Sequence, residues 1–219
     1  MKDMFVSESY FLCAVQKKGK IFSYDSAKIA CLLAAILWEA EQAGAVSVPD
    51  GRIIPAPELP PDTPWLTPFW EHLREMDTPN FKHLLQDYSS GFSDRHLNAL
   101  TQSLGDRLDA KGLVTKAKLG LFGGRTYFMP RRDSIPALTA ELKVDILFQT
   151  PPSTDSTFLW LLLEKSSCIP ETVTDEDRRL LREKVTSFLQ QSAGSELARL
   201  NALADRLISL SESLSVFFR

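Results

Sequence analysis

The sequence predicts a mainly helical protein: a hydrophobic central helix surrounded by amphipathic helices, with one or two small β-hairpins. Three observations predict this fold class. Apolar residues recur at helical spacing over most of the chain. One of these stretches, residues 26–43, is apolar on nearly every side and therefore belongs in a core. Alternating stretches that flank turn residues occur at few places. The 219 residues show no composition shift that requires a second domain, so we expect a single domain over 1–219.

The chain is expected to open with extended structure. Residues 5–15 mix apolar alternation with aromatic and β-branched side chains, which predicts a strand, and 21–24 are its expected short partner. Asp25 or Ser26 can then cap the central helix, which is expected to run to about Ala43.

Turn residues mark the boundaries of the later elements. A Pro-Asp-Gly turn at 49–51 predicts a small hairpin, and five prolines within 55–64 favour an extended connector. A glycine-rich turn between 113–119 and 125–129 predicts a second hairpin. The remaining apolar stripes predict helices at about 64–77, 79–88, 93–111, 133–148, 155–166, 174–191 and 195–217.

Motifs of catalysis and of metal or cofactor binding are missing from the sequence. It has no GxGxxG, no P-loop, no HExxH and no GxSxG pattern. His72, His83 and His96 fall on separate predicted helices without a nearby cysteine, and neither His72 nor His96 has a carboxylate at i+4. The three cysteines are far apart and form no paired motif. We therefore expect a non-enzymatic protein with no cofactor and no metal.

Positive charge is concentrated in one part of an otherwise acidic chain. The formal net charge is −3, yet residues 92–132 hold eight basic side chains against three acidic ones. The basic residues are Arg95, Arg107, Lys111, Lys116, Lys118, Arg125, Arg131 and Arg132. Such a basic zone favours a polyanionic partner, which is a phospholipid surface, a phosphoinositide head group or nucleic acid. A merely mixed, soluble surface is the other interpretation of the same composition.

Three classes of function remain open on the residues alone. The first is a domain that binds an anionic lipid surface, and the second is a DNA-binding protein. A helix followed by a hairpin with a Gly-Gly-Arg turn is also the layout of a winged-helix DNA-binding protein. Asp94, Asp106 and Asp109 on that helix would repel DNA, so nucleic acid is the less favoured partner. The third class is a structural oligomerisation module with no role in lipid binding.

Four segments in order resemble the Golgi phosphoprotein 3 family of lipid-binding domains, from about residue 5 to 191. They are YFLCAVQKKGKIFSYDS followed by CLLAAILWEAEQAGAVSV, then DRLDAKGLVTKAKLGLF, FLWLLLEKSSCI and DEDRRLLREKVTSFL. The resemblance implies a helical domain with a β-hairpin that binds phosphatidylinositol 4-phosphate on a basic membrane face. In eukaryotes, members also hold the cytoplasmic tails of Golgi glycosyltransferases, which implies a possible protein client.

The family's head-group pocket carries over only in part. Its tryptophan corresponds to Tyr24, and its arginine on the next helix corresponds to Leu33, which cannot bind phosphate. Two further arginines correspond to Asn98 and Thr101, which keep hydrogen-bonding capacity without charge, and Arg95 is positioned to substitute in part. The departures suggest a divergent member with a degraded pocket, and a bacterial source is one expectation that follows from them.

The second hairpin is expected to contact a membrane or another subunit. Its apolar tip, Leu121 and Phe122, lies beside Arg125, which is the layout of a membrane wedge. The same tip is suited to a homo-oligomer contact. The sequence has no apolar run of the ~20 residues that span a bilayer and no recognisable signal peptide. We therefore expect a cytoplasmic protein that associates peripherally with an anionic membrane.

Overall fold

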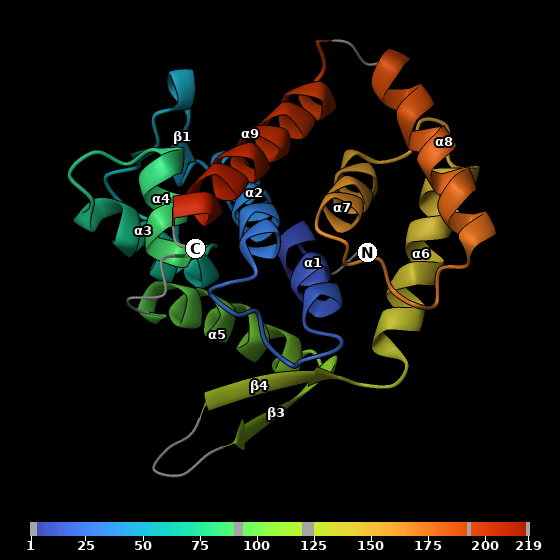
Figure 1. The fold of residues 1–219 in the computed structure, drawn as a ribbon, viewed down its shortest axis with the longest axis horizontal. Coiled ribbons are helices and arrows are strands. Elements are labelled where there is room, and N and C mark those ends of the chain that lie inside the picture. Colours follow the sequence, from blue (N-terminus) through green and yellow to red (C-terminus); the bar gives the residue numbers. More distant parts are fainter. Residues whose placement is uncertain (1–3, 90–93, 120–124, 192–193, 218–219) are drawn as a thin grey trace.

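The computed structural model describes residues 4–89, 94–119, 125–191 and 194–217. Within these residues the chain forms α-helices and two small antiparallel sheets of two strands each (Figure 1). The mainly helical class and the two hairpins predicted from the sequence are confirmed. The arrangement places three buried helices at the centre and the other elements around them.

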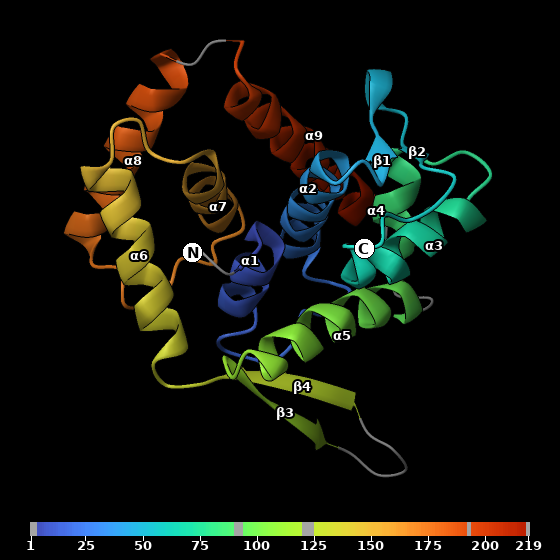
Figure 2. The ribbon, with the colours of Figure 1, turned by 180° about the vertical axis from the view of Figure 1, so that it is seen from behind.

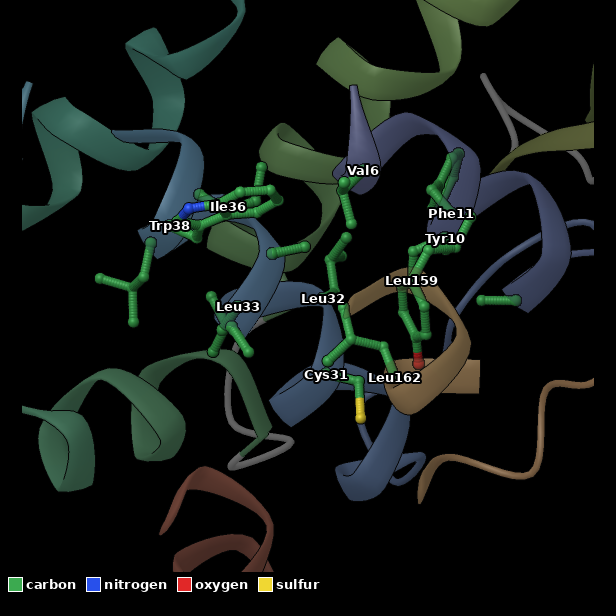
Figure 3. Packing of buried hydrophobic residues seen from close by; sticks show 14 of the residues in the cluster. Val6, Tyr10, Phe11, Cys31, Leu32, Leu33, Ile36, Trp38, Leu159 and Leu162 are labelled. Atoms are coloured by element: carbon green, nitrogen blue, oxygen red, sulfur yellow. The ribbon is translucent and has the colours of Figure 1, made fainter. Parts of the chain in front are cut away.

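The centre of the molecule consists of α1 (Val6–Ala14), α2 (Ser26–Gln42) and α7 (Thr154–Lys165). Every residue of α1 is buried, and twelve residues of α2 are buried, including the whole run Ile29–Ala40. Figure 3 shows side chains of these helices packed against one another, among them Tyr10, Leu32 and Leu159. The prediction of a hydrophobic central helix over 26–43 is confirmed.

The predicted strand over 5–15 is wrong, because this segment is helix α1. A helix that is buried on all sides has no polar face, so its sequence lacks the 3.6-residue period that identifies surface helices. Residues 21–24 are likewise not a strand. They form an irregular connection, held by a hydrogen bond from the Asp25 backbone N–H to the Phe22 carbonyl at 2.8 Å.

The outer elements enclose this centre on all sides that the two views show (Figures 1 and 2). On one side are α3 (Thr67–Glu75), α4 (Phe81–Ser89) and the short sheet of β1 (Val46–Ser47) and β2 (Ile54–Pro55). The 3₁₀ turns η1 (Pro49–Gly51) and η2 (Pro64–Leu66) lie within the connections there. On the other side are α6 (Ser134–Phe148) and α8 (Asp175–Gln191), and α9 (Glu196–Phe217) packs along α2.

The second hairpin packs across α5 (Arg95–Ala110) at one end of the molecule (Figure 2). Its strands β3 (Val114–Leu119) and β4 (Arg125–Pro130) pair in the register Val114 with Pro130. The buried ring of Phe128 lies so close to α5 that a Cβ on Gly105 would meet its ring atoms at 2.4 Å. Gly105 therefore allows the hairpin to approach the helix closely.

The core also encloses tryptophan rings, a thiol and one histidine. Trp160 is fully buried, Trp38 is nearly so, and Cys31 is a buried thiol whose pKa is raised to about 12 by burial. The histidine is His72, for which the sequence offers no carboxylate at i+4. It is buried, and its Nε2 lies 3.1 Å from Asp87 Oδ2, because α3 and α4 bring together residues that are fifteen positions apart.

Candidate anion-binding site

The candidate site forms where the loop after α1 crosses strand β4. The Phe128 backbone N–H donates to the Gly19 carbonyl at 2.7 Å and fastens the loop to the strand. Gly19 has a positive φ of 69°, and a Cβ there would lie 2.7 Å from Met129 Sδ. Only glycine fits this conformation and this contact without strain. The loop geometry sets Lys18 and Lys20 beside the hairpin.

Two lysines and three aromatic rings form what we call the cation–aromatic cluster: Lys18, Lys20, Phe22, Tyr24 and Tyr127. Phe22 and Tyr24 stack with ring centroids 5.1 Å apart, and Lys18 Nζ lies 5.2 and 5.4 Å from the two centroids. Lys20 Nζ lies 4.5 Å from the Phe22 centroid and 6.0 Å from that of Tyr127. Tyr24 is 68% exposed, so the cluster presents an aromatic edge to its surroundings.

Lys20 is the most constrained cation of the cluster. It is buried, and its pKa is lowered by desolvation and then by the positive charge of Arg125, against which Asp94 acts in the opposite direction. Two neighbouring cations, one of them poorly solvated, repel each other. A bound anion would relieve both the repulsion and the desolvation.

Beside the cluster is a cleft of about 230 Å³ between α5 and β4, which we call the α5–β4 cleft. It is lined by Asn98, Thr101, Gln102, Arg125, Thr126 and Phe128. The fold thus brings together three residues that the sequence singled out, namely Asn98, Thr101 and Arg125. The Thr101 hydroxyl donates to the Leu97 carbonyl at 2.7 Å, so its proton is already in use within the helix. Arg125 is the one cation among these lining residues.

The other residues predicted for the site lie elsewhere. Tyr24 belongs to the cation–aromatic cluster, and Arg95, in the first turn of α5, is not among the described residues that line the cleft. Leu33 is fully buried in the core. Leu121 and Phe122 lie outside the described residues. Sequence reasoning missed Lys18, Lys20 and Tyr127 as site residues, although the run Lys17–Lys20 signalled the two lysines.

Part of the predicted basic zone has a structural role instead of a surface one. The Glu8 carboxylate is fully buried, yet it contacts Arg107 Nε at 2.7 Å and Lys111 Nζ at 2.6 Å. It also accepts a hydrogen bond from the Phe5 backbone N–H at 2.9 Å. We call these three charged residues the Glu8 triad. They link α1 to α5, because a buried carboxylate requires such partners.

A further ion pair reduces the number of basic side chains in the zone that are available to bind a partner. Lys116 Nζ on β3 lies 2.5 Å from Asp106 Oδ1 on α5. Arg107, Lys111 and Lys116 are therefore committed to carboxylates, and the sequence-based view of the whole zone as one docking face is too broad. Exposed basic side chains of the zone include those of Lys118 and Arg125 on the hairpin.

Across residues 4–89, 94–119, 125–191 and 194–217, no group of three or more histidine, cysteine, aspartate or glutamate side chains is placed to hold a metal ion. None of the helices in those same ranges combines the length and apolar character needed to cross a bilayer.

The fold and the site define a class of protein: a helical domain with a hairpin packed on one helix and a cationic cluster at the junction. The comparison with protein families narrows this class. The family model described as Golgi phosphoprotein 3 (GPP34) matches residues 6–204, and the chain belongs to that family. It is a family of non-enzymatic adaptors. No curated protein sequence matches the chain.

Proposed function

We propose that this protein is a non-catalytic adaptor domain that docks onto the cytoplasmic side of an anionic phospholipid membrane. The observation that carries the proposal is the cation–aromatic cluster beside the α5–β4 cleft. Family membership adds support, since an adaptor of this kind suggests phosphoinositide and protein partners in general. The exposed groups of the docking surface are Lys18, Tyr24 and Arg125, and the buried Lys20 adds its positive charge nearby.

The chemistry of these groups suits lipid phosphate. An arginine offers paired donors that match two phosphate oxygens, and an ammonium adds a compact positive charge. Tyr24 is suited to the interfacial region, because its ring combines an apolar body with a polar hydroxyl group, and Phe22 adds apolar surface to the same stack. A phosphate between Lys20 and Arg125 would offset the repulsion that lowers the pKa of Lys20.

Charge, more than head-group shape, is expected to decide which lipids bind. Asn98 and Thr101 line the cleft without charge, and Leu33 is enclosed in the core. A pocket with one lining cation makes fewer directed contacts with a phosphorylated inositol than a pocket with several arginines. We therefore expect similar binding to phosphatidylinositol 4-phosphate and to other anionic lipids at equal total charge.

The test is co-sedimentation with phosphatidylcholine vesicles that contain a rising fraction of phosphatidylserine. Binding is expected to rise with the anionic fraction and to fall with salt. The variant K18Q/R125Q should weaken binding at least about tenfold, since each basic residue at the surface contributes about 1 kcal/mol. The matched control R178Q/R179Q removes two exposed charges from α8 and should leave binding unchanged apart from a small long-range effect.

Indifference to lipid charge would refute the proposal, as would equal losses in the two variants. The winged-helix alternative loses support from the structure, because Arg107 and Lys111 on or next to α5 are bound to Glu8. Oligomerisation through the hairpin tip stays a prediction, and analytical ultracentrifugation of the same protein tests it.

A further inference from the structure

We propose a second binding site, for a small organic ammonium ion, in a cavity of about 920 Å³ between the amino-terminal end of α1 and the start of α9. We call it the acidic cavity. It is lined by residues other than those of the proposed membrane surface, and by carboxylates in place of cations. Ligand binding in the acidic cavity would be independent of lipid binding.

The walls of the acidic cavity combine aromatic rings with acidic side chains. Phe5, Trp38 and Trp65 supply the rings. Phe5 stacks on Trp65 with centroids 4.2 Å apart, and 37% of Phe5 is exposed although the residue is large and apolar. The Arg107 guanidinium already lies over these two rings, 5.3 Å from the Phe5 centroid and 4.5 Å from that of Trp65, so a positively charged ligand would share them with Arg107. Quaternary ammonium groups are recognised through the negative potential of such ring faces.

Four carboxyl groups line the same cavity: Glu39, Asp62, Asp155 and Glu196. Among the described residues, none of the lining side chains is a lysine, arginine or histidine, and none of the four carboxyl groups takes part in a salt bridge. Their hydrogen-bond donors are neutral. Glu39 accepts from the Ser7 backbone N–H at 2.7 Å and from its hydroxyl, and Glu196 accepts from Trp38 Nε1 at 3.4 Å.

Two of the carboxyl groups have raised pKa values, as expected of acidic groups that are partly or fully buried and face no cationic partner among the described residues. The pKa of Asp155 is raised by partial burial and then by Asp145 and Glu196. The pKa of Glu39 is raised to about 8, mainly by burial, with smaller contributions from Glu8 and Asp155. A cation in the cavity would lower these values, so the site is electrostatically suited to one.

The polar groups of the wall are not all satisfied by the protein. The buried indole N–H of Trp65 has no acceptor among the described residues. A ligand that carries a hydroxyl next to its ammonium group would supply both the positive charge and an oxygen acceptor. Aromatic rings, uncompensated carboxylates and this free donor together favour an amino alcohol of the choline type over an apolar or anionic ligand.

Choline and its neutral isostere 3,3-dimethylbutan-1-ol make a matched pair of probes, since they have the same shape and differ in charge. The chain has four tryptophans, of which Trp38 and Trp65 line the cavity and Trp70 and Trp160 do not. Choline titrated into the full-length protein should shift the indole N–H resonances of Trp38 and Trp65 saturably. Those of Trp70 and Trp160 should stay in place, and the isostere should bind at least about tenfold more weakly.

Two variants complete the test. D155N/E196Q removes two exposed carboxylates and is expected to weaken choline binding about tenfold, on the scale of one partly exposed charge contact for each residue. D175N/E176Q removes two exposed carboxylates from α8 and should leave the affinity unchanged. Equal binding of choline and its isostere, equal losses in the two variants, or no saturable shift at Trp38 and Trp65 would each overturn the proposal. A failure of vesicle binding would leave these results unaffected.

Discussion

Replacing Gly105 by alanine tests how tightly the hairpin is packed on α5. The residue is inside the helix and buried. Three atoms of the Phe128 ring lie 2.4 to 2.5 Å from the position of the new Cβ, well inside the ~3.5–4.0 Å at which carbon atoms make optimal contact. The ring must therefore move, and it is itself buried and packed edge-on against Phe11 with centroids 6.0 Å apart.

Two effects of opposite sign determine how much G105A changes the free energy of unfolding. Alanine favours a helix interior over glycine by about 1 kcal/mol. Forcing extra volume into a well-packed core costs about 1–3 kcal/mol, and here the contact is with a ring that has little room to rotate. Because the ring cannot easily move, we expect a cost near the upper end of this range, about 3 kcal/mol, and hence a net loss of about 2 kcal/mol in the free energy of unfolding, which lowers Tm by about 4–8 °C for a chain of this size.

Urea denaturation of a double-mutant cycle measures this contact directly. F128L removes the ring that G105A would strike, so G105A should be neutral or stabilising in the F128L background. The expected coupling energy is at least about 1 kcal/mol. If G105A destabilises the protein equally in both backgrounds, the clash with Phe128 is not the cause and our account of the hairpin packing is wrong.

Two buried carboxyl groups yield further predictions of opposite character. Because the folded-state pKa of Glu39 is raised to about 8 from its ordinary value of 4.5, the folded protein keeps a proton that the unfolded chain releases, so stability falls as pH rises between these values. In E39Q this pH-dependent loss of stability should disappear. The free energy of unfolding of E39Q, measured by urea denaturation, should therefore rise relative to that of the parent from pH 5 to 8.5. Parallel pH profiles of the two proteins would contradict this. E8Q should instead cost about 3 kcal/mol at neutral pH, because it breaks the buried Glu8 triad. A calorimetric Tm for E8Q within 2 °C or so of the parent would contradict the triad's structural role.

The surface helices were predictable because each has one buried face. α8 was expected at 174–191 and runs over Asp175–Gln191, and α6 was expected at 133–148 and runs over Ser134–Phe148. The stripe of apolar residues alone fixes such elements. α1 was not predictable in this way, since all nine of its residues are buried and no polar face marks the helical period. Its polar residues Ser7, Glu8 and Ser9 are inside the protein as well.

The candidate site was only partly predictable, because its parts come from distant stretches of the chain. Asn98, Thr101 and Arg125 were chosen by resemblance and by charge, and they do line one cleft. Lys18 and Lys20 join them through a backbone contact between Gly19 and Phe128, which no local pattern announces. The acidic cavity was equally difficult to predict from the sequence, since its carboxyl groups come from α2, α7, α9 and a connecting loop.

Charge composition locates basic residues but does not distinguish those that face solvent from those that balance a buried acid. Arg107 and Lys111 illustrate the difference. They belong to the most basic part of the sequence, yet they neutralise a carboxylate from a helix about a hundred residues earlier. This pairing fixes α5, and through Gly105 and Phe128 the hairpin, to the buried centre. The two cations thus position the surface on which Arg125 is displayed, so their loss should affect the proposed membrane docking by displacing the hairpin and not by removing a phosphate contact.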